Sequence, residues 1–240
     1  MDGILLINKP RGYTSHDVVS LIRRRFSLKK VGHAGTLDPM ATGVLIILIG
    51  KYTKYSPLFL NEDKEYEGTL VLGATSDTGD AWGKVTPSGK QIEPERARIE
   101  SAFGKFVGLI KQVPPMYSAV KIKGRKMYEL ARKGLTIAVE PRTVSVKRLD
   151  ITAIALPEIS FKVVCSKGTY VRQLCADIGQ ELGCGGYLSM LNRTRSGRFD
   201  ISQTLGIEEL KNLDNAELEK RLLKEPYDSY KRIAETKEAG

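Results

Sequence analysis

Short apolar runs and amphipathic segments alternate along the chain, and their spacing predicts both strands and helices. Residues 44–49 are continuously apolar and lie between two glycines, which is typical of a buried strand. Residues 3–8 form another short apolar run. Strands are also predicted at residues 66–72, 145–156 and 159–166.

Three segments carry apolar residues at helical spacing. The first helix is predicted to begin at Ser15, the second follows Pro94, and the third is expected to end at Gly183, because glycine is favoured just after a helix. The apolar positions are Val18, Leu21, Ile22 and Phe26 in the first helix, Ile99, Phe103 and Phe106 in the second, and Val171, Leu174, Cys175, Ile178 and Leu182 in the third.

Several predicted strands follow one another directly, with helices between them at irregular intervals. This order favours an α+β fold, with a mixed, largely antiparallel sheet flanked by helices and loops, over a doubly wound parallel sheet. From residue 200 onward the composition is helical and polar, and residues 231–240 have too little apolar content to form a core. We therefore expect one main domain at residues 1–205 and a helical C-terminal extension with a frayed tail at residues 206–240.

Composition excludes several classes of protein. The 240 residues are 41% hydrophobic and 28% charged, and no apolar run approaches the roughly 18 residues that a membrane span needs. The first residues lack the pattern of a signal peptide. Three cysteines without a C-x-x-C pair predict reduced thiols in a cytoplasmic protein, and His16 and His33 share no metal-ligand spacing. We expect no membrane association and no metal.

Charge is the first property that indicates a partner. Lysine and arginine number 38 against 28 acids, a formal charge of +10, which attracts polyanions. Residues 111–148 hold ten of the bases and only two acids. Tyr117 and Tyr128 lie in the same stretch, and aromatic rings among bases favour RNA, although a solvated basic hairpin is an alternative interpretation.

The sequence lacks the phosphate-binding, dinucleotide-binding, serine-hydrolase and zinc-protease motifs. Its most unusual segment is residues 32–43, in which three glycines surround a single carboxylate, Asp38. Taken alone, Asp38 followed by Pro39 is better explained by the start of a helix, where Asp caps and Pro occupies the first turn. His33, taken alone, is explained by packing or by surface exposure.

Taken together, five stretches resemble the TruB family of tRNA pseudouridine synthases, which isomerise uridine 55 in the T loop of tRNA. Four of them span residues 8–12 with 14–17, 32–39 with 41–45, 64–66 with 72–73 and 75–80, and 168–172 with 182–185: NKPRG and TSHD; GHAGTLDP and ATGVL; KEY, LG and TSDTGD; GTYVR and LGCG. The fifth, QVPPMYSA at residues 112–119 together with Gly124, Tyr128 and residues 131–132, is similar to the family's RNA-gripping insertion, expected at about residues 111–142.

The resemblance implies a pseudouridine synthase fold and assigns Asp38 as the catalytic carboxylate. Arg172 is implied as the partner that orients Asp38 and keeps it ionised, although a surface arginine is the simpler interpretation of its position. Tyr66 is implied to stack on the target uracil, whereas packing is the ordinary role of a strand tyrosine. The remaining implied roles are pocket lining by Tyr170 and Leu191, a site floor shaped by Lys9 and Pro10, base flipping assisted by His33, and RNA binding by Lys121, Lys123, Arg125, Lys126 and Arg132.

The implied reaction breaks the bond between ribose C1′ and base N1 and joins C1′ to C5, so it requires no cofactor. The expected partner is the T-arm stem-loop of tRNA, and the protein is expected to be a cytoplasmic monomer. Many family members continue into a β-rich RNA-binding module of the PUA type, and we expect residues 206–240 not to form a complete one. A non-catalytic tRNA-binding or folding module and a carboxylate-dependent hydrolase are alternatives, the latter weakened because no second acid lies in a matched motif.

Overall fold

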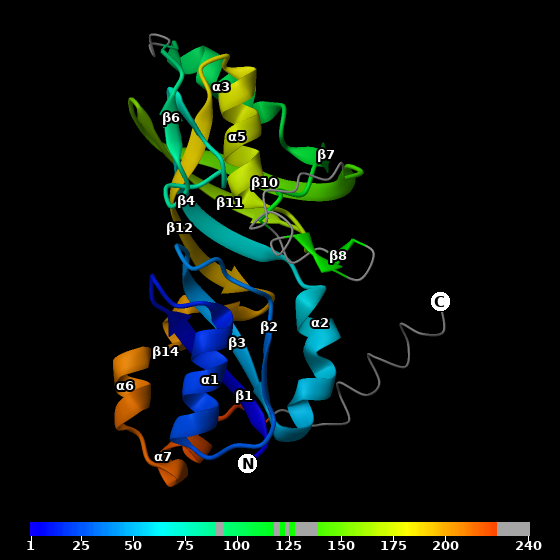
Figure 1. Ribbon diagram of the computed structural model, residues 1–240, viewed down its shortest axis with the longest axis vertical. Coiled ribbons are helices and arrows are strands. Elements are labelled where there is room, and N and C mark those ends of the chain that lie inside the picture. The colour runs from blue at the N-terminus through cyan, green and yellow to red at the C-terminus, as the bar shows by residue number, and fades with distance from the viewer. Residues whose placement is uncertain (90–93, 118–120, 123–124, 128–138, 225–240) are drawn as a thin grey trace. The chain divides into compact units, whose positions relative to one another are not determined.

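The computed structural model describes residues 1–89, 94–117, 121–122, 125–127 and 139–224 (Figure 1). The chain forms two compact units. Unit 1 comprises Met1–Glu65 and Asn192–Gly240, and unit 2 comprises Tyr66–Leu191. Strands β4 (Lys64–Leu72) and β12 (Gly186–Ser196) contain residues of both. The division of the chain at residue 205 stays a prediction.

The sheet of unit 1 is built around β3 (Thr42–Ile49), which is buried at every position after Thr42. The buried strand predicted at residues 44–49 is thus confirmed. One edge of β3 pairs antiparallel with β1 (Gly3–Lys9). The other edge pairs antiparallel with β2 (Val31–Ala34) over residues 46–49 and parallel with β12 over residues 42–43. β14 (Leu205–Gly206) runs parallel to β1, and β13 (Phe199–Asp200) pairs with β12.

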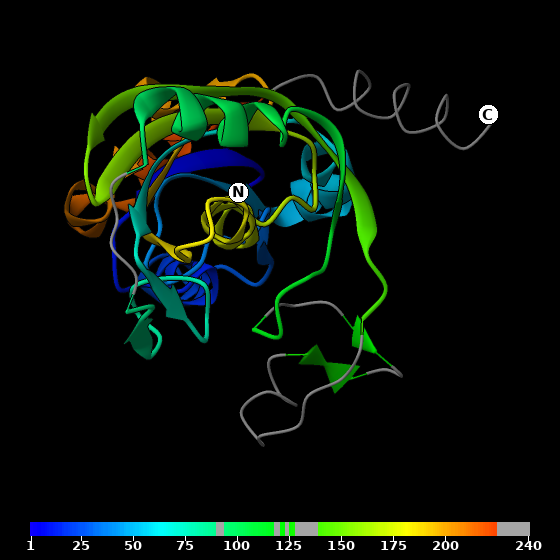
Figure 2. The same ribbon diagram turned by 90° about the horizontal axis from the view of Figure 1, so that it is seen from above.

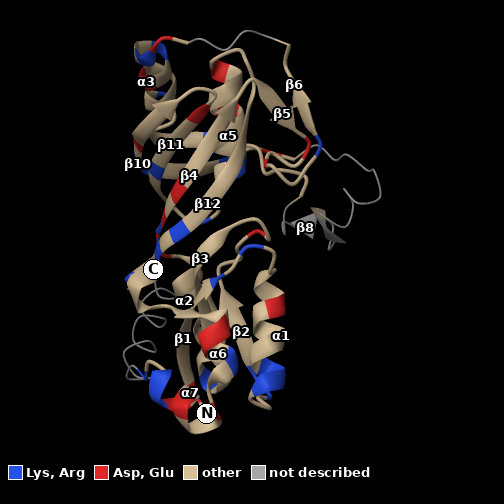
Figure 3. Ribbon diagram, turned by 90° about the vertical axis from the view of Figure 1, so that its left-hand side faces the viewer, with Lys and Arg blue, Asp and Glu red and all other residues tan. Residues whose placement is uncertain are grey.

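Helices complete unit 1. Helix α1 (Ser15–Arg25) begins where the sequence predicted, because Thr14 caps it and Asp17 bonds back to the Thr14 amide. Its C-terminal end carries three consecutive exposed arginines, which stand out as a basic cluster in Figure 3. The other helical segments are η1 (Gly50–Tyr55), α2 (Ser56–Leu60), η2 (Ile201–Gln203), α6 (Ile207–Asn212) and α7 (Asn215–Arg221).

Unit 2 contains a sheet in the order β12, β4, β11 (Glu158–Cys165), β10 (Arg142–Ala155) and β7 (Gly108–Gln112). β10 pairs antiparallel with both β11 and β7. In Figure 2 these long strands curve over the helix α5 (Val171–Glu181), which is seen end-on. Two short antiparallel ribbons lie outside the sheet, β5 (Ala74–Ser76) with β6 (Val85–Pro87), and β8 (Lys121–Ile122) with β9 (Arg125–Lys126).

Two helices of unit 2 agree with the predicted amphipathic segments. Helix α3 (Arg96–Gly104) buries Phe103, whose ring lies 6.2 Å from that of Phe161 on β11. The prediction that Phe106 belongs to this helix was wrong, because α3 ends at Gly104. Helix α5 ends before Gly183, which adopts a φ of 78° and donates its amide to Gln180.

The predicted α+β fold with a largely antiparallel sheet is confirmed. The three cysteines are buried thiols that form no disulfide. Within the described ranges, no helix is long and apolar enough to cross a membrane. No group of three or more His, Cys, Asp and Glu residues among the described residues could hold a metal ion. The predicted frayed tail lies outside the described residues.

Candidate active site

Asp38 lies in the loop that joins β2 to β3 in unit 1. This loop, residues 35–41, leaves the sheet where the neighbour of β3 changes from β2 to β12. Asp38 is partly exposed, while Leu37 and Met40 beside it are buried. The interpretation of Asp38 as a helix cap was wrong: residues 38–41 form a turn, closed by a 3.0 Å hydrogen bond from the Ala41 amide to the Asp38 carbonyl, and lead into a strand.

Contacts on both sides of Asp38 fix its backbone. The Ser15 hydroxyl accepts a 2.9 Å hydrogen bond from the Leu37 amide and donates a 3.2 Å bond to the Leu37 carbonyl. On the other side, the Pro39 carbonyl accepts a 2.8 Å bond from the Gly12 amide. The turn therefore presents its one carboxylate from a rigid backbone, as a catalytic group requires.

Arg193, on β12, anchors the start of the Asp38 loop. It is fully buried at 1% exposure, and its guanidinium donates to the carbonyls of Val44 at 2.7 Å and Gly35 at 3.0 Å. Gly43 has a φ of 103°, and a side chain there would collide with the backbone of Arg193. Glycine at this position therefore permits the close approach that positions Arg193 beneath the loop.

Lys9, at the end of β1, supports the loop from below. Its side chain is completely buried, and its ammonium donates to the carbonyls of Tyr13 at 2.7 Å, Pro10 at 3.0 Å and Pro39 at 3.4 Å. Burial lowers the pKa of Lys9 to about 8; the charge of Asp38 opposes this shift, and that of Arg193 adds to it. Lys9 thus holds the backbone of the Asp38 loop through the Pro39 carbonyl, and its role in shaping the floor of a site stays a prediction.

We expect the pKa of Lys9 to fall below about 8 in Asp38→Asn, because the attraction of a negative charge for the ammonium is lost. Asp17→Asn is the control and should lower this pKa less, since Asp17 acts on Lys9 more weakly than Asp38 does. The measurement is an NMR titration of the lysine ε-methylene signals, assigned with Lys9→Arg. An unchanged Lys9 pKa in Asp38→Asn would contradict the proximity of the two groups.

The same pKa predicts how stability varies with pH. The folded-state pKa of Lys9, about 8, lies below the ordinary value of 10.5, so the unfolded chain binds more protons between these two values. The contribution of Lys9 to the free energy of unfolding therefore rises as the pH increases from about 8 to about 10.5.

His33 lies on β2 and is partly buried, opposite Ile47 of β3. Burial lowers its pKa, with smaller effects in the same direction from the charges of Arg193 and His16. Its buried Nδ1 has no hydrogen-bond partner among the described residues. His33 is therefore neutral near pH 7, and its role in base flipping stays a prediction.

Arg172, at the start of α5 in unit 2, is buried with a side-chain exposure of 5%. The interpretation of Arg172 as a surface arginine was wrong. Its guanidinium donates to the carbonyls of Thr78 at 2.7 Å and Tyr117 at 3.0 Å, and its Nε lies 3.6 Å from the carboxylate of Asp80. Asp80 is thus a carboxylate partner that the sequence had not indicated. The implied pairing of Arg172 with Asp38 stays a prediction, since the two residues belong to different units.

Tyr170, the residue that precedes α5, is held by Gln112 at the end of β7. The Gln112 side chain accepts a 2.8 Å bond from the Tyr170 amide and donates a 3.1 Å bond to its carbonyl. Gln112 is itself buried. Tyr66, on β4, and Leu191, on β12, are also buried in unit 2. A binding role for Tyr66, Tyr170 and Leu191 stays a prediction.

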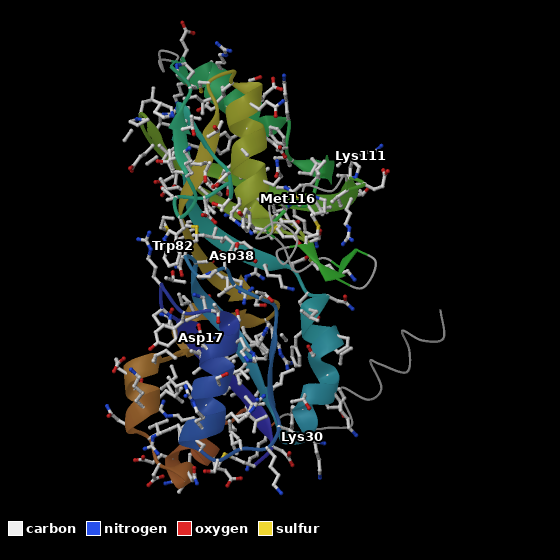
Figure 4. The ribbon with its side chains drawn as sticks, viewed as in Figure 1. Asp17, Lys30, Asp38, Trp82, Lys111 and Met116 are labelled. Atoms are coloured by element: carbon white, nitrogen blue, oxygen red, sulfur yellow. The ribbon has the colours of Figure 1, made fainter. Side chains whose placement is uncertain are left out.

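Unit 2 also contains a cavity of about 590 Å³ between α5 and the loop after β5. Gln173, Ala176 and Gln180 of α5 line one wall, and Met116, labelled in Figure 4, lines another. None of the predicted site residues that the structure describes is part of this lining. Of the predicted RNA-binding residues, Lys121 lies on β8, Arg125 and Lys126 lie on β9, and Lys123 and Arg132 lie outside the described residues.

Comparisons with known proteins identify the family. The model of the TruB family pseudouridylate synthase (N terminal domain) matches residues 23–171, more than half of the chain. The chain belongs to the TruB family. The model of the tRNA pseudouridylate synthase B C-terminal domain matches residues 172–229 of this TruB-family chain.

Curated relatives of the TruB-family chain agree with this result. The tRNA pseudouridine synthase B of Opitutus terrae is 46% identical over 223 residues, which cover 93% of this chain and 92% of the relative. The enzyme of the same name from Alkaliphilus oremlandii is 49% identical over 217 residues, which cover 90% of this chain and 72% of the relative.

Solved structures show the same fold. A chain of a Cbf5-Nop10-Gar1 complex has a TM-score of 0.69 and 31% identity, over 88% of this chain and 54% of that chain. A chain of an H/ACA RNP bound to a substrate RNA containing 2′-deoxyuridine has a TM-score of 0.66 and 28% identity, over 88% of this chain and 52% of that chain. The TruB-family chain thus spans about half the length of these chains. The predicted pseudouridine synthase fold is confirmed.

Proposed function

We propose that the TruB-family chain converts uridine 55 in the T loop of tRNA to pseudouridine, with Asp38 as the catalytic carboxylate. Family membership and the names of the relatives support tRNA pseudouridine synthesis. The observation that carries the role of Asp38 is its loop: residues on both sides of Asp38 are fixed by Ser15 and Gly12, and the carboxylate itself is partly exposed.

The chemistry explains why a single fixed carboxylate suffices. The reaction breaks the bond from C1′ to N1, rotates the uracil and forms a bond from C1′ to C5; N1 gains a proton and C5 loses one. No electrons or groups enter or leave, so the reaction requires no redox cofactor. A carboxylate assists such a reaction as a nucleophile, a base or a countercharge. In this proposal Arg172 orients the reacting groups, and Tyr66, Tyr170 and Leu191 enclose the uracil.

The proposed substrate element is the T-arm stem-loop, bound by a monomeric, cytoplasmic enzyme. His33 would occupy space left by the flipped uridine, because base flipping requires that lost stacking be replaced. The basic insertion, including Lys121, Arg125 and Lys126, would contact phosphates.

The test is incubation of the protein with a T-arm stem-loop RNA, followed by digestion and chromatography of the nucleosides. We expect pseudouridine in an amount approaching one residue per RNA. RNA binding without pseudouridine would instead support the non-catalytic tRNA-binding module.

The basic insertion predicts a steep salt dependence of RNA affinity. We expect replacement of Lys121, Lys123, Arg125 and Lys126 by alanine to flatten the slope of log Kd against log salt by up to about 3.6, because each lost phosphate contact removes roughly 0.7–0.9 from the slope. Filter binding at several salt concentrations measures the slope. Replacing Arg23 and Arg24 of α1 by alanine is the control, and an equal change in slope there would show that the effect is one of net charge alone.

A further inference from the structure

Trp82 is the single tryptophan of the chain, and half of its surface is exposed. It lies in unit 2, in the loop between β5 and β6, on the side opposite Lys111 in the view of Figure 4. Tryptophan is highly buried on average and is enriched at binding interfaces, because its large ring contributes much contact area. None of the roles proposed above uses Trp82.

The backbone beneath the ring is fixed. The Asp80 carboxylate accepts hydrogen bonds from the Trp82 amide at 3.0 Å and from the Thr78 hydroxyl at 2.8 Å. The Ala81 amide donates to the Leu188 carbonyl of β12 at 2.9 Å, which attaches the loop to the sheet. A ring on such a backbone loses little conformational freedom when it binds a partner.

The same carboxylate connects Trp82 to the predicted site. One oxygen of Asp80 bonds the Trp82 amide, and the other lies 3.6 Å from Nε of Arg172. The backbone of Trp82 therefore occupies a fixed position relative to the guanidinium that is proposed to orient the reacting groups. The indole ring of Trp82 can stack on an unpaired base, because every nucleobase has a flat face that stacks on an aromatic ring.

We propose that Trp82 is a stacking platform for an unpaired nucleobase of the RNA substrate. Two acidic groups lie in the loop: Asp80 is buried, 3.6 Å from Arg172, and Asp77 is exposed and accepts a 2.8 Å bond from the Lys84 amide. The exposed Lys84 lies two residues from Trp82. This proposal rests on the proposed function for the identity of the RNA, and it adds a contact outside the catalytic residues.

The first test uses the intact protein, because its tryptophan fluorescence reports on Trp82 alone. We expect a T-arm stem-loop RNA to quench this fluorescence in a saturable titration whose midpoint matches the Kd from filter binding. Absence of quenching at RNA concentrations that saturate filter binding would overturn the proposal.

The second test uses variants of Trp82. We expect Trp82→Ala to weaken RNA binding about tenfold, since the stacking of one base is lost, and Trp82→Phe to retain most of the affinity because it keeps an aromatic face. The single-turnover rate at saturating RNA should be unchanged, because Trp82 takes no part in the chemistry. Leu109→Ala is the control, since Leu109 is 77% exposed on β7 of the same unit.

Equal affinities for Trp82→Ala and the wild type would overturn the stacking role and leave the ring for an apolar protein partner. The test of the stacking role and the test of the proposed function can fail independently. If RNA quenches the fluorescence of the wild type and binds Trp82→Ala more weakly, but the wild type forms no pseudouridine, the stacking role of Trp82 stands and the proposed enzymatic function is wrong. If the wild type forms pseudouridine and Trp82→Ala binds RNA as tightly as the wild type, the enzymatic function stands and the stacking role is wrong.

Discussion

Asp38→Asn is expected to lower pseudouridine formation by about 10⁴-fold or more, the scale of loss when a group that acts directly on the reacting atoms is removed. The amide cannot act as a nucleophile, a base or a countercharge. The loop should keep its shape, because Ser15, Gly12 and Arg193 hold the backbone of Leu37, Pro39 and Gly35 rather than the Asp38 side chain.

RNA affinity of Asp38→Asn should therefore stay close to that of the wild type, and thermal stability should fall only slightly, because the attraction between Asp38 and the Lys9 ammonium is lost. Single-turnover assays, filter binding and thermal melts measure the three quantities separately. Asp150→Asn, an exposed carboxylate on β10, is the matched control and should leave all three unchanged. A parallel loss of stability and activity in Asp38→Asn would show that Asp38 acts structurally.

Arg172→Met is expected to lower both stability and activity. The variant leaves Asp80 buried without its cation, and breaking a buried ion pair from one side costs about 3–5 kcal/mol in the free energy of unfolding. It also removes the hydrogen bonds to Thr78 and Tyr117. The rate should fall by about a hundredfold or more, because a charge that orients the reacting groups is lost.

A double variant, Arg172→Met with Asp80→Asn, separates the effect on stability from the effect on activity. Asp80→Asn removes the buried charge while its amide oxygen still accepts from Thr78 and Trp82, so it should restore about 1–3 kcal/mol of stability in the Arg172→Met background. Activity should not recover. Denaturant unfolding gives the stability, and single-turnover assays give the rate, of the wild type, the two single variants and the double variant. Arg98→Met is the control. Recovery of activity together with stability would show that Arg172 serves only to hold the fold.

The sequence predicted best those features that depend on local pattern. The continuous apolar run of β3, the stripe of α5 and the start of α1 all follow from spacing and capping, which neighbouring residues determine. Strand β12 was not predicted, although it supplies both Leu191 and Arg193. After Leu191 its buried positions are Arg193 and Ser196, so the alternation of apolar and polar residues that marks a strand is missing from the sequence there.

For the site residues too, the sequence indicated what is local and missed what depends on residues distant in the chain. Asp38, Arg172 and Tyr66 were predicted as site residues through resemblance alone, because single carboxylates, guanidiniums and tyrosines have ordinary structural explanations. Asp80 and Gln112 lay inside recognised stretches, but their roles required partners distant in the chain, Arg172 and Tyr170. A buried arginine such as Arg193 cannot be distinguished from an exposed one by composition, because its burial depends on carbonyls that the fold supplies.

The most direct measurement maps pseudouridine in an unmodified full-length tRNA transcript after incubation with the protein. Nucleoside analysis gives the amount, and chemical labelling followed by primer extension gives the position. The account predicts one pseudouridine per tRNA, at uridine 55, with the wild type and Asp150→Asn, and none with Asp38→Asn. A transcript without pseudouridine, or with pseudouridine only at another position, would contradict it.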